Sequence, residues 1–188
     1  MLKRALIASC MILGFSISSA NAMLGAGIGP YVDINGGYGF SDSNTINSAV
    51  NQKNSGFGYN INAGWMFIPF IGLEAGYTKY TDVTYRLNNQ NQSASSDSYD
   101  IAIKGVAPLP LTGFSLYGKL GVGQLRQGSL NFSSNNIDKQ TANNLYWAVG
   151  AKYDIALGFY SQLQYAVQQG GNSLPSNSLL SLGIGYQL

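Results

Sequence analysis

The chain has 188 residues, enough for a single domain. Only 10% of its residues are charged, against about 25% in an ordinary soluble domain, and it has 24 glycines, 13 tyrosines and no histidine. The absence of histidine excludes a Ser–His hydrolytic pair and any histidine-ligated metal site.

The N-terminal segment, residues 1–22, has the pattern of a secretory signal peptide. A basic start is followed by an apolar run over residues 5–15 and by an A-x-A site ending at Ala22. The run is shorter than the ~20 residues of a spanning helix, which favours a signal peptide over an N-terminal anchor. Cleavage after Ala22 would leave a domain over 23–188. This domain lacks cysteine, because Cys10 is removed, and has equal numbers of acidic and basic residues.

Apolar residues then recur at every second position in eight segments. Large apolar and aromatic side chains occupy one phase of each segment, whereas Gly, Asn, Gln and a few charges occupy the other. A period of two is typical of β-strands with two unlike faces. The segments cover 31–40, 57–67, 71–80, 99–107, 114–122, 145–155, 159–167 and 180–188.

The connections between these segments alternate between long and short. The long polar ones cover 41–55, 81–97, 127–143 and 170–178, and the short ones cover 68–70, 109–112 and 156–158. Exported β-barrels have short periplasmic turns and longer outer loops, and a sheet in lipid must close to pair its backbone groups. We predict an all-β fold, an eight-stranded antiparallel up-and-down transmembrane β-barrel in which the last strand pairs with the first. A soluble lipocalin-like barrel, the alternative, would carry many more surface charges.

The apolar phase is expected to face lipid. Aromatic residues near the ends of the segments should form two interfacial girdles. The residues predicted for these girdles are Trp65, Phe67, Tyr99, Phe114, Trp147 and Phe159.

Three short segments of the predicted strands resemble parts of a known protein family. They are Gly72–Tyr77 (GLEAGY), Asp100–Pro108 (DIAIKGVAP) and Leu116–Gly123 (LYGKLGVG). They resemble the transmembrane domain of OmpA-type outer-membrane proteins and related small barrels such as OmpX. The resemblance covers the whole domain and implies an outer-membrane location in a Gram-negative bacterium. Because the chain ends with the predicted barrel, we expect no peptidoglycan-binding domain after it. The resemblance also implies that the last strand is the assembly signal read by the barrel-insertion machinery, through Leu182, Ile184, Tyr186 and Leu188.

The polar phase predicts seven ionisable residues in the lumen: Asp33, Glu74, Asp100, Lys104, Lys119, Lys152 and Asp154. If the segments 71–80 and 99–107 pair as a hairpin that is symmetric about residue 89, the middle of the loop between them, Glu74 lies directly opposite Lys104. These residues could form a salt-bridged plug, or they could serve a gated pore or supply a catalytic carboxylate. The plug is favoured because buried charges persist when paired and eight strands leave little interior room. The resemblance also implies a lumen filled by such ion pairs.

The functional hypothesis is an integral outer-membrane protein with a structural role that displays four surface loops. A narrow gated pore for ions or small solutes and a surface adhesin are the alternatives. We predict no enzymatic activity and no catalytic, cofactor-binding or metal-binding residue. The expected partners are outer-membrane lipids, the barrel-insertion machinery and a surface ligand of the loops, with no role for nucleic acid because the mature charges balance.

Overall fold

The computed structural model describes residues 27–42, 50–53, 55–87, 90–128, 130–132, 135–137, 140–171 and 174–188. Within these ranges no helix is long and apolar enough to cross a membrane. The predicted signal peptide and its cleavage site lie outside the described residues.

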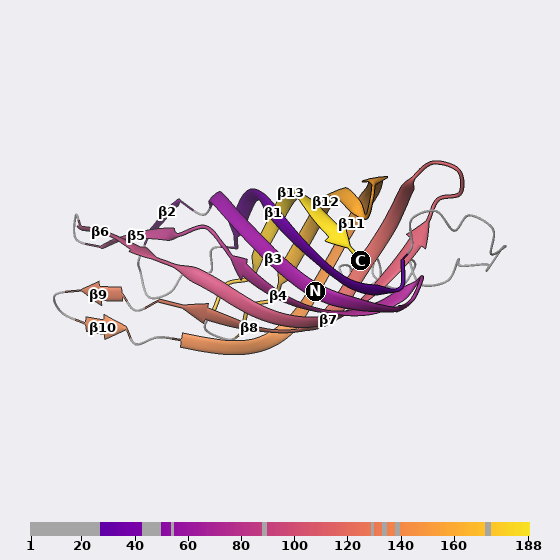
Figure 1. Cartoon of the computed structure of the whole chain (residues 1–188). Helices are drawn as coiled ribbons and strands as arrows, with labels where there is room; N and C mark the ends of the chain where they lie inside the picture. Colours follow the sequence, from indigo (N-terminus) through magenta and orange to yellow (C-terminus); the bar gives the residue numbers. More distant parts are fainter. Residues whose placement is uncertain are drawn as a thin grey trace, which may run out of the picture.

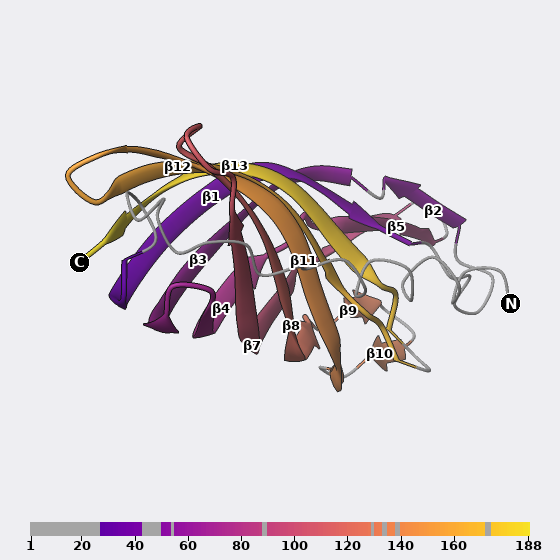
Figure 2. The ribbon, with the colours of Figure 1, turned by 90° about the vertical axis from the view of Figure 1, so that its right-hand side faces the viewer.

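Eight long strands close into an antiparallel barrel, which confirms the predicted fold (Figures 1 and 2). They are β1 (Gly29–Ser41), β3 (Ser55–Ile68), β4 (Ile71–Lys79), β7 (Ser96–Pro108), β8 (Phe114–Gln127), β11 (Gln140–Ala156), β12 (Phe159–Gln168) and β13 (Asn177–Gln187). Their order around the barrel is β1-β13-β12-β11-β8-β7-β4-β3, so the first and last strands pair. Closure leaves no strand of the barrel with an unpaired edge.

Short strands occur within three of the four segments predicted to be long loops, which corrects that prediction. They are β2 (Val50–Lys53), β5 (Val83–Leu87), β6 (Gln90–Ala94), β9 (Leu130–Phe132) and β10 (Asn135–Ile137). One small sheet has the order β2-β5-β6, and β9 pairs with β10. Both project beyond the barrel at the end opposite the C-terminus (Figure 2). Pairing outside the barrel does not require an apolar face, so polar composition concealed these strands.

The barrel strands bury their polar phase and expose their apolar phase, and aromatic rings gather near both ends of the exposed face. At the short-turn end, Phe114 packs on Tyr153 with ring centroids 4.7 Å apart. At the loop end, Tyr77 packs on Tyr99 at 5.0 Å. Of the six aromatic residues predicted for the girdles, five are exposed and Trp147 is half-buried. The surface therefore has an apolar band between two aromatic belts, the form that suits a bilayer.

Candidate functional site

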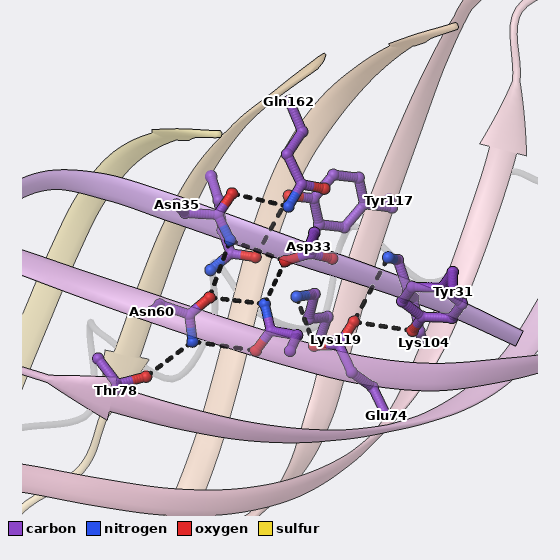
Figure 3. A network of polar contacts seen from close by, with 12 residues as sticks. Tyr31, Asp33, Asn35, Asn60, Glu74, Thr78, Lys104, Tyr117, Lys119 and Gln162 are labelled. Carbon is purple, nitrogen blue, oxygen red and sulfur yellow. Dashed lines mark hydrogen bonds and ion pairs between the residues drawn. The ribbon is translucent and has the colours of Figure 1, made fainter. Parts of the chain in front are cut away.

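A buried ion cluster lies in the half of the lumen nearer the short turns. Glu74 on β4 is only 1% exposed. Its Oε1 lies 2.5 Å from the Nζ of Lys119 on β8, and its Oε2 lies 3.4 Å from the Nζ of Lys104 on β7. The Tyr31 hydroxyl also donates a hydrogen bond of 2.8 Å to Oε2 (Figure 3). One carboxylate is thus paired with two buried lysines, so each lysine has a counter-charge nearby and the three groups together carry a net charge of +1.

The predicted register of this cluster is wrong by two residues. Glu74 lies opposite Ala102, and Lys104 lies opposite Gly72 on β4. The register is centred on residue 88 rather than 89, because β4 and β7 pair as far as Lys79 and Asp97. The long lysine side chain still reaches Glu74 diagonally. Since Lys104 is directly opposite Lys119 on β8, the Glu74 carboxylate separates two like charges that would otherwise repel each other.

A second polar network, made mostly of amides, surrounds Asp33 on β1. Its Oδ1 accepts hydrogen bonds from Asn35 Nδ2 (2.8 Å) and Asn62 Nδ2 (2.6 Å), and its Oδ2 accepts one from the Tyr160 hydroxyl (3.2 Å). Asn35 also donates to Asn60, and Figure 3 shows how these side chains converge inside the barrel. Neutral donors therefore satisfy this carboxylate. The repeated asparagines on the lumen phase were a readable signal of this network that sequence reasoning missed.

The remaining predicted lumen residues separate into two groups. Lys152 Nζ lies 2.8 Å from Asp154 Oδ1 near the short-turn end, and lies 4.9 Å from the centroid of the Tyr160 ring. Asp100 is only 3% exposed, and neither of its oxygens has a hydrogen-bond partner. The structure therefore brings Glu74, Lys104 and Lys119 together and pairs Lys152 with Asp154. Asp33 is held by amides and a tyrosine, and Asp100 stands apart.

An apolar cap closes the loop end of the lumen. It consists of Tyr80, Leu125, Leu174 and Leu179, with Ala142 packed against them. Leu125 and Leu179 sit on the lumen phase of β8 and β13, where neighbouring positions are polar or glycine. Two leucines on a polar phase were a second signal that sequence reasoning missed.

The opposite, short-turn end contains a small hollow. It is lined by Tyr31, Met66, Lys104, Lys152 and Tyr160, together with residues at the barrel rim. About 10 Å³ is free for the centre of a water molecule, roughly the room that one water needs. In the described residues, no group of three or more Asp, Glu, His or Cys side chains could hold a metal ion.

The predicted assembly residues lie on the outer face of β13 and just beyond its end. The side chains of Leu182, Ile184, Tyr186 and Leu188 are all exposed. Their part in assembly stays a prediction.

Residues 7–187 match the sequence model of a family described as the outer membrane protein beta-barrel domain. Neisserial surface protein A has a similar structure, with 16% identity, a TM-score of 0.61, and coverage of 85% of this chain and 97% of that one. The N-terminal β-barrel domain of Pseudomonas aeruginosa OprF is also similar, with 16% identity, a TM-score of 0.57, and coverage of 84% of this chain and 97% of that one. A third similar structure is that of Ail, the attachment invasion locus protein of Yersinia pestis, in complex with the heparin analogue sucrose octasulfate. Its identity is 16%, its TM-score is 0.55, and the match covers 86% of this chain and 100% of that one. No curated protein matches the chain in sequence.

Proposed function

Because the chain belongs to the outer membrane protein beta-barrel domain family and lies in the outer membrane, we propose that it is a sealed envelope barrel that anchors and displays surface segments. It reaches the membrane after export and loss of residues 1–22. Outer-membrane lipids surround it, and the barrel-insertion machinery assembles it. The barrel itself has no catalytic role.

The observation that carries this proposal is the closure of the lumen in successive layers. The Glu74 cluster and the Asp33 amide network fill the short-turn half and the middle, while Tyr80 and Leu179 belong to the apolar cap at the loop end. Eight strands leave an interior just wide enough for side chains, and here those side chains bond or pack to one another. A barrel filled in this way suits a rigid anchor better than a conducting pore.

Single-channel recording of the refolded protein in a planar bilayer tests this proposal. Wild type should be silent, because neither the polar plug nor the apolar cap leaves a continuous path. The double variant Glu74→Ala, Lys104→Ala opens only the polar layer, and the double variant Leu125→Ala, Leu179→Ala opens only the cap. Each should stay silent, because the other layer still closes the lumen. Discrete openings of wild type, changed by the first variant, would instead support the narrow gated pore.

A surface-binding role is the second candidate, favoured by the small sheet of β2, β5 and β6 that projects from the loop end (Figure 1). Paired strands offer a more ordered binding surface than loops alone. The structural neighbour Ail was crystallised with a heparin analogue, which makes a sulfated glycan a reasonable first probe. Replacing residues 83–94 with a short Gly-Ser turn should abolish binding to immobilised heparin if this role is correct. Unchanged binding, or none by wild type, would count against heparin as the ligand.

A further inference from the structure

The three short turns of the barrel are apolar, and their tips are exposed. They connect β3 to β4, β7 to β8 and β11 to β12 through residues 69–70, 109–113 and 157–158, and none of them contains a charged residue. Figure 2 shows the β11–β12 turn at the same end of the barrel as the C-terminus. Leu111 is fully exposed and Leu157 is 89% exposed. Apolar residues that gather at one end of a molecule indicate a partner other than water.

The backbone at two of these tips has a conformation that leucine rarely adopts. The φ angle is 64° at Leu111 and 53° at Leu157. Both values lie in the left-handed region, where Gly, Asn and Asp are the ordinary residues. An asparagine at either position would relieve the strain and would suit water better. A watery environment therefore does not account for a leucine at both tips.

Polar groups of the turns bond within the protein. The Thr112 hydroxyl donates a hydrogen bond of 2.9 Å to the carbonyl oxygen of Leu109 and accepts one of 3.1 Å from the backbone N–H of Phe114. One carbonyl oxygen of each turn also accepts a backbone hydrogen bond of 2.9 or 3.0 Å from a neighbouring strand. These oxygens belong to Phe70, Gly113 and Gly158. Backbone groups need such internal partners where water is scarce.

The lipid-facing surface of the barrel continues into the turns. Leu157 stands between Ile155 and Phe159, which are both exposed on the outer face of β11 and β12. On the other side of the barrel, β4 has only nine residues, and the last of them is Lys79. A strand that spans a membrane takes about 9–11 residues. The apolar part of β4 is therefore short for a crossing, and the exposed Phe70 in the turn before it extends the apolar surface.

We propose that the short turns rest in the inner leaflet of the outer membrane, with Leu111 and Leu157 in contact with lipid. The leaflet is the inner one because exported barrels keep their short turns on the periplasmic side. The turns lie at the boundary between headgroups and acyl chains, since the ion pair of Lys152 with the partly accessible Asp154 is near the same end and needs a polar surrounding. Apolar side chains of interfacial segments insert about 5–10 Å at this level. This placement does not depend on whether the lumen conducts.

Fluorescence quenching in lipid nanodiscs, which leave both membrane faces open to water, tests this placement. Residues 23–188 contain no cysteine, so a single environment-sensitive label can be attached to Leu111→Cys or Leu157→Cys. Leu163→Cys, on the lipid-facing side of β12, and Asp82→Cys, at the accessible loop-end rim, define the two ends of the scale. Lipids brominated near the headgroup end of their acyl chains should quench the turn labels, and aqueous iodide should quench them clearly less than the Asp82→Cys label. Iodide quenching equal to that of Asp82→Cys would place the tips in water and overturn the proposal, and a periplasmic protein would then be the better candidate partner.

The substitution Leu111→Asn separates lipid from water without a label. Because asparagine tolerates the left-handed backbone, this change should leave stability unchanged or raise it if the tip meets water. If the tip meets lipid, the ratio of folded to unfolded protein in urea should fall by about tenfold in vesicles, the order expected when a leucine loses its apolar surroundings. Leu157→Asn should behave in the same way. Equal or higher stability of the two variants would overturn the proposal, and the quenching experiment does not require either of them to fold.

Discussion

The two ends of the lumen are closed by different kinds of chemistry. The short-turn half holds Glu74 between two lysines, whereas the loop end is closed by Tyr80, Leu125, Leu174 and Leu179. Apolar packing stabilises a fold directly, but a buried ion pair contributes little net stability because desolvation offsets the attraction. The cap therefore both seals the lumen and stabilises the fold, whereas the ion cluster mainly destabilises any arrangement in which its three charges are not in contact.

The largest effect is expected from Glu74→Ala. This change leaves Lys104 and Lys119 as buried neighbours without a counter-charge, so the free energy of unfolding should fall by about 3–5 kcal/mol. Urea unfolding of the protein refolded in lipid vesicles measures this loss. The control Asp154→Ala removes a half-buried carboxylate near the barrel end and should cost clearly less. Equal losses would mean that the cluster has no special dependence on its central carboxylate.

A somewhat smaller loss is expected from Leu179→Ala in the cap. Removing a fully buried leucine leaves a cavity and should lower the free energy of unfolding by about 2–5 kcal/mol. The matched control on the same strand is Leu182→Ala, at a side chain that is 67% exposed on the outer face. If the control lost as much stability as Leu179→Ala, the cap would be no more tightly packed than the lipid-facing surface.

Two glycines on β8, between the two ends of the lumen, allow a test of how tightly the barrel wall is packed. A Cβ at Gly121, on the lumen side, would lie 2.0 Å from the backbone oxygen of Ile101, so Gly121→Ala should cost about 1–3 kcal/mol. A Cβ at Gly118, on the outer side, meets nothing closer than 3.9 Å. Gly118→Ala should therefore be neutral or stabilise by up to ~1 kcal/mol. The same unfolding assay distinguishes them, and a reversed order would refute the assigned faces.

The smallest effect is expected at the rim, outside both closures. Lys79 Nζ lies 3.8 Å from Asp82 Oδ1, and both side chains are accessible to water. Asp82→Asn should change the free energy of unfolding by no more than about 1 kcal/mol, and the change should shrink as salt is added. A loss as large as that of Leu179→Ala would show that the rim contributes to barrel stability as much as the cap does.

The alternation of apolar residues predicted the strands and their faces, because one face meets lipid and the other meets a crowded lumen. It did not predict the contact between Lys119 and Glu74, since that contact depends on the register and on side-chain reach. The register error arose because β7 begins at Ser96, before the apolar alternation becomes visible at Tyr99. The hairpin β5–β6 was missed for a different reason: its residues are mostly polar, and its pairing is made by backbone groups that apolar periodicity does not reveal.

The pairing of β1 with β13 also has a consequence for how the protein is made. Tyr31 near the start of the described chain pairs with Gln187 near its end, so the barrel cannot close until the last strand has been synthesised and exported. Contacts so distant in sequence form slowly, and chains that wait for them expose strand edges that aggregate. The strands therefore reach their final pairing only once the whole barrel sequence is available, and until then the edge of β1 has no partner from β13.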